Sequence, residues 1–178
     1  MKKMKYTALF LAAFAAASCE KSSTVDVDPP ETGPSAALTA VIEAAPDGEA
    51  SPIHMARQTI QPGDKVTVSG QVMGNEHPFV EGRAAFILGD PAVLTPCNEK
   101  PDDGCETPWD ACCDTPEDKK RGTATIQIVD ADGRVLKESI EGVGGIGNLA
   151  KLIVSGTVAE GSSTDALVIN ASAIEVER

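Results

Sequence analysis

The sequence is poor in aromatic residues and in histidine. Among 178 residues there are four Phe, one Tyr and one Trp, so a folded core must rest mainly on Val, Ile, Leu and Ala. The two histidines, His54 and His77, are not near an obvious nucleophile, which leaves hydrolase chemistry with little support. The sequence also lacks a nucleophile-elbow, a zinc-protease and a phosphate-loop motif. We therefore expect no enzymatic activity.

Positive charge is also scarce. The chain has 15 Lys+Arg against 27 Asp+Glu, a formal net charge of −12. Removing residues 1–18 takes away three lysines and no acid, which leaves 12 against 27 and a charge of −15. Such a surface repels a phosphate backbone, so we expect no nucleic acid as a partner. The short basic run at 119–121 follows two acids and is typical of a solvated turn.

No apolar run is long enough to cross a bilayer, which takes about 20 residues. The longest near the start is Ala8–Ala17, ten residues that follow Lys2, Lys3 and Lys5. A positive segment, a short apolar segment and then small residues are typical of a secretory signal peptide. We therefore expect residues 1–18 to direct export.

Cys19 directly follows Ala16-Ala17-Ser18, and this arrangement resembles the end of a bacterial lipoprotein signal peptide. The resemblance implies a lipid attached to Cys19 and an anchor in the membrane of the cell envelope, facing the periplasm or the outside. One departure is Ala16, where the family usually has Leu. The alternative is an ordinary signal peptide cut after Ala17, with Cys19 left as a thiol.

The polar, proline-containing residues 19–50 are expected to form a flexible tether, although Ala36–Ala45 has the composition of a short helix or an extended lead-in. Residues 51–178 are enough for one domain. Alternation of apolar and polar residues predicts strands. The expected strands are 51–60, 65–72, 83–89, 123–129, 134–140, 152–158 and 166–176, with a helical turn at 148–151 and a bulge near Ala173.

The expected fold is all-β, a small OB-fold-like barrel of five to seven strands with one short helix, and a β-sandwich is the alternative. Two strands contain the same pattern, in Val68–Val72 and Val154–Val158, and each has a central glycine. Glycine within a strand often marks a sharp bend at a barrel corner. Chains of this size close into barrels or sandwiches to hide their edges. The resemblance to an OB fold covers about residues 60–177.

Residues 91–122 form a long insertion between two predicted strands and contain four of the five cysteines. If Cys19 carries lipid, these four form an even set, and in an exported protein they are expected to be disulfide-bonded. Adjacent cysteines pair poorly because their Cα atoms are about 3.8 Å apart. Two pairings remain open: Cys97–Cys112 with Cys105–Cys113, or Cys97–Cys113 with Cys105–Cys112. Either would brace the insertion.

Metal binding and thiol-redox chemistry are two other possible uses of these thiols. A zinc site usually has cysteines two to four residues apart within a pair, whereas the spacing here is C-x7-C-x6-C-C. A reactive thiol needs nearby cations or a helix N-terminus, and the neighbouring residues are mostly acidic. We therefore expect no metal and no cofactor. A metal-binding or thiol-redox protein using this cluster is the alternative function.

Trp109 and Asp110 lie between the second and third of these cysteines. Trp109 is expected to cover the disulfides or one end of the barrel. The alternative is that Trp109 forms a platform on which a ligand such as a sugar stacks. Trp109 and Asp110 together are our candidate ligand contact.

The string C-x7-C-x-TPWD-x-CC, preceded by PFVEGRAAFILGDP at 78–91, resembles a family of uncharacterised exported bacterial proteins. That family shares a lipoprotein leader and a β-rich body, and it implies no activity. The sequence thus predicts a cell-envelope lipoprotein that acts as a non-enzymatic binding or interaction module, with an envelope protein or a glycan as its partner.

Overall fold

The computed structural model describes residues 33–100, 104–163 and 165–177. The predicted leader, Cys19 and most of the predicted tether lie outside these residues. No helix within the described ranges is long and apolar enough to cross a membrane.

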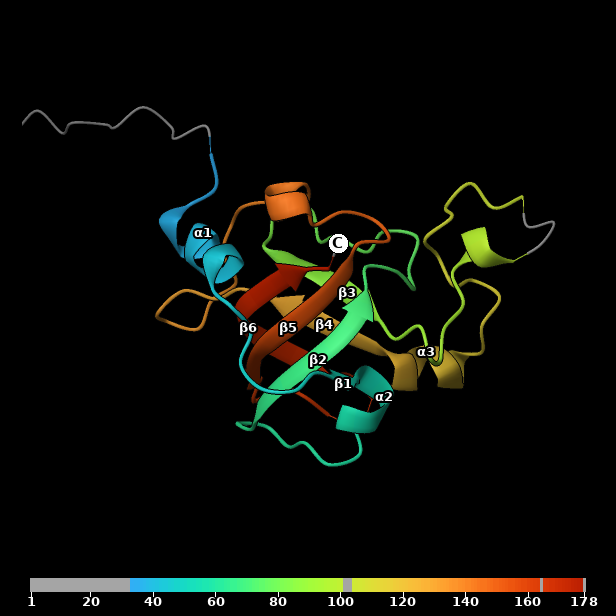
Figure 1. Ribbon diagram of the computed structural model, residues 1–178, viewed down its shortest axis with the longest axis horizontal. Helices are drawn as coiled ribbons and strands as arrows, with labels where there is room; N and C mark the ends of the chain where they lie inside the picture. The colour runs from blue at the N-terminus through green and yellow to red at the C-terminus, as the bar shows by residue number, and fades with distance from the viewer. Residues whose placement is uncertain (1–32, 101–103, 164, 178) are drawn as a thin grey trace, which may run out of the picture. The chain divides into compact units, whose positions relative to one another are not determined.

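Six strands form one sheet that closes into a barrel (Figure 1). Their order is β1-β2-β3-β4-β6-β5, and β5 pairs again with β2. The strands are β1 (Ser51–Pro52), β2 (Lys65–Gln71), β3 (Ala85–Gly89), β4 (Thr123–Gln127), β5 (Lys151–Val158) and β6 (Val168–Val176). The barrel itself has five strands, with β1 added in parallel beside β2. The fold is therefore a small all-β barrel, as predicted, and its order is that of an OB fold.

The register explains how the ring closes. The two long antiparallel pairs are β2–β5, with Val68 opposite Val154, and β5–β6. Strand β4 runs parallel to β6, which completes the ring. The β5–β6 register shifts between Ser155 and Gly156, opposite Ala171–Ala173, so the bulge predicted near Ala173 is confirmed.

Alternating side chains of these strands fill the barrel. Phe86, Leu88, Ile126 and Val154 are fully buried, as the period-two pattern predicts. The two pattern glycines lie where the chain has no room for a side chain. A Cβ on Gly70 would be 2.7 Å from the carbonyl oxygen of Gly89, and one on Gly156 would be 2.3 Å from that of Asn170. Glycine thus allows two strands to approach closely.

The folded unit begins earlier than predicted. Helix α1 (Ala36–Glu43) begins after Ser35, whose hydroxyl accepts a hydrogen bond from the backbone of Leu38. Leu38 is fully buried, because α1 packs along β6. The end of the expected tether is therefore part of the barrel domain.

Three local predictions were wrong. Of the expected strand at 51–60, only Ser51–Pro52 form a strand, β1, and Ile53–Ala56 form helix α2, in which Ile53 and Ala56 are buried. The expected strand at 134–140 is reduced to one bridge between Val129 and Val135. The helical turn expected at 148–151 lies earlier, as the 3-10 helix η2 (Val143–Gly145).

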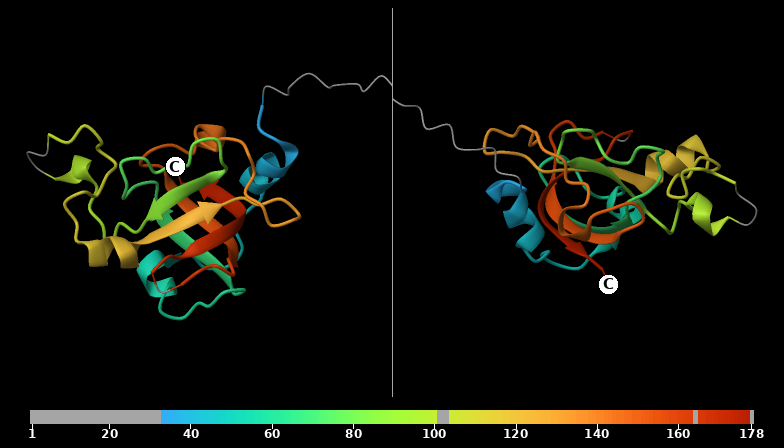
Figure 2. Two further views of the ribbon diagram at one scale, coloured as in Figure 1. Left: turned by 180° about the vertical axis from the view of Figure 1, so that it is seen from behind. Right: turned by 90° about the horizontal axis from the view of Figure 1, so that it is seen from above.

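The insertion at 91–122 extends from the opposite side of the barrel from α1 (Figure 2). It contains the 3-10 helix η1 (Cys97–Glu99) and helix α3 (Pro116–Gly122), which ends directly at β4. A second small hydrophobic cluster of Met73, Leu94 and Ala111 joins the insertion to the barrel. The insertion and the barrel therefore share a small apolar core.

Candidate functional site

Backbone hydrogen bonds fix the insertion at both ends. The N–H of Asp90 donates to the carbonyl of Gly122 at 2.8 Å. This bond joins the residue that precedes the insertion to the last residue of the insertion. Further out, the N–H of Cys97 donates to Asp110 at 2.8 Å, and that of Asn98 donates to Pro108 at 2.9 Å. These bonds fold the segment back on itself, so cysteines distant in sequence come together.

The sulfur atoms of the cysteines form a cluster. Those of Cys97, Cys105 and Cys112 all lie within 4.8 Å of one another. The sulfur of Cys112 is 3.5 Å from that of Cys97 and 3.7 Å from that of Cys113. Cys97 is buried and Cys105 half-buried, whereas Cys112 and Cys113 are exposed. Cys97, Cys105 and Cys112 are thus brought together, with Cys113 beside Cys112, although no disulfide bond joins them within the described part of the chain. The two pairings stay a prediction.

One cation lies beside the cluster. Lys100 donates from Nζ to Oδ1 of Asp114 at 3.0 Å, and the other oxygen of Asp114 accepts from the N–H of Thr95 at 2.8 Å. Burial lowers the pKa of Lys100, but its hydrogen bond to Asp114 and its proximity to Cys113 and Cys97 raise it overall. Asp114 thus holds the Lys100 ammonium group beside the cluster.

Hydrogen bonds also act on the thiols. The hydroxyl of Thr107 is 3.3 Å from the sulfur of Cys105, and hydrogen bonds from the side chain and then the backbone of Thr107 lower the pKa of Cys105. The acidic neighbours noted in the sequence do not decide this thiol's chemistry, because local hydrogen bonds act at shorter range.

Trp109 joins the insertion to the barrel. Its indole N–H donates to the carbonyl of Glu76 at 2.9 Å, and its own carbonyl accepts from the N–H of Gly74 at 3.0 Å. The side chain is half-buried. Asp110 follows in the same turn, and its Oδ1 accepts from the N–H of Ala111. The contacts fit the expected covering role of Trp109, and ligand binding by this pair stays a prediction.

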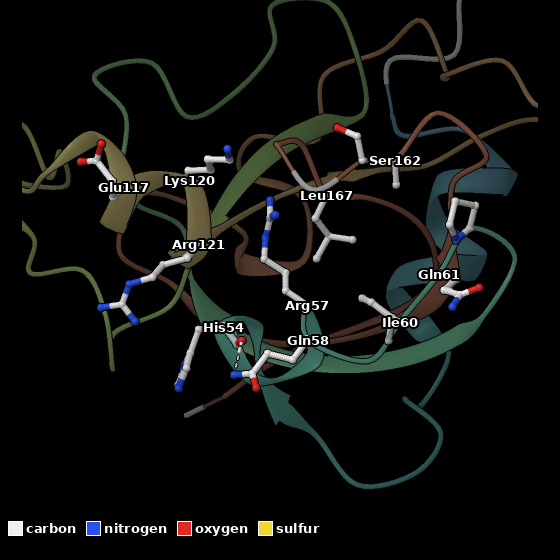
Figure 3. Close-up of a pocket in the computed structure, with 12 residues that line it drawn as sticks. His54, Arg57, Gln58, Ile60, Gln61, Glu117, Lys120, Arg121, Ser162 and Leu167 are labelled. Carbon is white, nitrogen blue, oxygen red and sulfur yellow. Dashed lines mark hydrogen bonds between the residues drawn. The ribbon is translucent and has the colours of Figure 1, made fainter.

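A pocket that the sequence analysis missed lies between α2, α3 and the loop that joins β5 to β6. Its volume is about 590 Å³. Its lining is contributed by three separate segments, namely His54, Arg57, Gln58, Ile60, Gln61, Pro62, Glu117, Lys120, Arg121, Ser162, Ser163 and Leu167. Figure 3 shows the Arg57 side chain extending into this pocket, between Lys120 and Leu167. We call it the Arg57 pocket.

Arg57 is the most enclosed charge of the pocket. Its Nε and Nη2 atoms donate to the carbonyl of Thr123 at 3.4 and 3.2 Å, which fixes the side chain. Burial lowers the pKa of Arg57, and the negative charge of Asp165 opposes that shift. Ile60 is half-buried and Leu167 is 4% exposed, so an apolar wall lies beside the guanidinium.

His54 lies at the edge of the pocket and is held by a buried carboxylate. Oδ2 of Asp90 is 2.7 Å from Nδ1 of His54 and also accepts from its backbone N–H at 2.9 Å. Oδ1 of Asp90 accepts from the N–H of Ala92 at 2.9 Å. Asp90 is 1% exposed. It thus fixes α2, which carries His54 and precedes Arg57, to the end of β3.

A second cavity, of about 780 Å³, lies on the β3–β4 face beside Val80, Arg83 and Gln127. Two further cations, Arg134 and Lys137, line it, and Arg134 is exposed and paired with Asp130 and Asp132 in the turn that follows β4. Charges of this kind are largely neutralised by solvent and by their partners. The Arg57 pocket is therefore the better place to hold a charged small molecule.

Comparison of the chain with protein families, curated proteins and solved structures gives no match in any of the three. The fold assignment above rests on the strand order and pairing. The resemblances to bacterial lipoproteins and to exported proteins with the TPWD-x-CC string stay predictions.

Proposed function

We propose that this chain is a cell-envelope lipoprotein, anchored through Cys19, that acts as a non-enzymatic binding module, and that the Arg57 pocket is its binding site. The occupant is a small organic anion with an apolar part. The observation that supports this most is the half-buried guanidinium of Arg57 beside the apolar side chains of Ile60 and Leu167.

The size and lining of the pocket support a small-molecule ligand. Ligand sites usually measure about 300–1,000 Å³ and combine apolar walls with a few well-placed polar groups. A guanidinium offers planar paired donors that suit a carboxylate. At the rim, Lys120 is paired with Asp165 and Arg121 with Asp118. Arg57 extends into the pocket beside the apolar wall, and we take it as the group that supplies the charge for recognition.

The arrangement of polar groups supports binding without catalysis. A histidine that activates a serine must be within hydrogen-bond reach of its hydroxyl. Figure 3 shows Ser162 on the opposite side of the pocket from His54. The contact between Asp90 and His54 has a structural purpose, since the same carboxylate accepts two backbone N–H groups.

A binding experiment tests the pocket. We use octanoate as the probe, because it combines a carboxylate with an apolar chain, and octanol as its uncharged counterpart. The full chain should bind octanoate and bind octanol more weakly in equilibrium dialysis. Arg57→Gln removes the charge and keeps similar bulk, so octanoate affinity should fall by roughly 10- to 100-fold, since a hydrogen bond to a charged group contributes about 1.5–3 kcal/mol.

Arg83→Gln is the matched control, because Arg83 lines the second cavity. It should leave octanoate affinity unchanged. Equal losses in the two variants, or no octanoate binding by the unaltered chain, would contradict the assignment of the pocket.

The anchor is tested separately. Cells that make the chain in the presence of labelled fatty acid should yield labelled protein in the membrane fraction, and Cys19→Ser should abolish the label. An unlabelled wild-type protein whose mass corresponds to cleavage after Ala17 would show instead an ordinary secreted protein.

A further inference from the structure

The spacing of the sulfur atoms in the insertion differs from that of a disulfide. Bonded sulfurs are about 2.05 Å apart. Here the sulfur of Cys112 is 3.5 Å from that of Cys97, and the sulfurs of Cys97, Cys105 and Cys112 all lie within 4.8 Å of one another. The sulfur of Cys113 is 3.7 Å from that of Cys112, its neighbour in the chain, so it lies at the edge of this set.

These separations are close to those of thiolates around one metal ion. Zinc binds cysteine sulfur at about 2.3 Å in a tetrahedron, so two ligands of one ion are about 3.8 Å apart. The sequence spacing did not indicate this geometry, because zinc sites are usually recognised by cysteines two to four residues apart. In this chain three stretches of the insertion contribute the sulfurs, and backbone bonds such as that from Cys97 to Asp110 bring them together.

The insertion holds these residues firmly. Ala111, directly before Cys112, is fully buried against Met73 and Leu94. On the other side of the pair, Asp114 accepts from Thr95 and Lys100. Lys100 also lies close enough to Cys97 and Cys113 to interact with their charge. Four thiolates around a divalent ion carry a net charge of −2, and the nearby ammonium group reduces it.

We propose that Cys97, Cys105, Cys112 and Cys113 bind one thiophilic divalent cation, with Zn²⁺ as the ion that fits best. Each thiol releases a proton to solvent as it binds, and no electron is transferred. Sulfur ligands favour zinc over hard cations such as Ca²⁺ and Mg²⁺. A site with four protein ligands is structural rather than catalytic, so the ion would brace the insertion in place of disulfides. This site does not depend on the Arg57 pocket.

The experiment uses the full chain, isolated in detergent under anaerobic reducing conditions and freed of metal. Titration with Zn²⁺ should show one ion bound per chain, with a rise in melting temperature. Titration with Co²⁺ should give the absorption of a tetrahedral thiolate complex. Cys112→Ser should weaken binding by at least about 10-fold, the loss that even an outer-shell partner can cause. Cys19→Ser is the control and should bind one ion as before.

X-ray absorption at the zinc edge of the unaltered protein tests the ligands without depending on how a variant folds. The expected first shell contains sulfur alone. A shell of nitrogen and oxygen would overturn the proposal, as would binding that depends on Cys19. Protein isolated from the envelope with two disulfides among the four cysteines and no zinc would also overturn it, in favour of the disulfide prediction.

Discussion

Replacing Asp90 with asparagine should destabilise the barrel and loosen the Arg57 pocket. The buried carboxylate accepts three hydrogen bonds, from the backbone and Nδ1 of His54 and from the backbone of Ala92. Asparagine keeps one accepting oxygen and presents an NH₂ group in place of the other. In its better orientation it keeps both His54 bonds and turns its NH₂ toward the N–H of Ala92.

The magnitude follows from these contacts. A buried donor left without an acceptor costs about 1–3 kcal/mol, and a hydrogen bond that loses its charged acceptor weakens by about 1 kcal/mol. The free energy of unfolding should therefore fall by about 2–4 kcal/mol. Because α2 would lose its attachment to β3, octanoate affinity should fall as well.

The measurement is urea unfolding of the full chain, followed by circular dichroism and by the fluorescence of Trp109, the chain's one tryptophan. Asp132→Asn is the control, since that side chain is 70% exposed and pairs with Arg134 at the surface. It should change stability by less than about 0.5 kcal/mol. If Asp90→Asn proves as mild as the control, Asp90 does not hold α2 as described.

Three further substitutions test other parts of the fold. Leu38→Ala should lower the free energy of unfolding by about 2–5 kcal/mol because it leaves a cavity beneath α1; a neutral result in urea unfolding would place α1 outside the folded unit. Gly156→Ala should cost about 1–3 kcal/mol, since its Cβ would meet the Asn170 carbonyl, and an unchanged melting temperature would refute this close approach. Thr115→Ala removes the N-cap of α3 and should cost about 1 kcal/mol. It should also raise the pKa of Asp118, which the Thr115 hydroxyl and then Arg121 lower. That carboxylate contributes stability above its unfolded pKa and loses it as pH falls through its lowered folded pKa. An NMR titration that shows the same pKa in both proteins would contradict this contribution.

The strands of the barrel could be predicted because each has one buried face. In β2, β4 and β5 the branched apolar residues alternate with polar ones, and the alternation alone identifies which side chains fill the barrel. The central glycines Gly70 and Gly156, predicted to mark bends, lie where two strands approach closely. The segment at 53–60 was mistaken for a strand because four residues of helix are too few to show a clear helical period.

The pocket and the sulfur cluster depend on contacts between distant segments. Arg57, Lys120 and Leu167 come together only when α2, α3 and the β5–β6 loop are folded. For the cysteines, sequence spacing suggested which pairs are unfavourable but not where the sulfurs would lie. Their convergence depends on backbone bonds such as that between Asn98 and Pro108, which no local pattern indicates.

The assignment of the Arg57 pocket as the binding site is tested most directly by an NMR titration of the full-length protein with octanoate. The account predicts that the largest shifts are those of the Arg57 side-chain Nε–H signal and of the methyl groups of Ile60 and Leu167. Shifts centred instead on Val80 and Arg83 at the second cavity, or on the indole of Trp109, would contradict it.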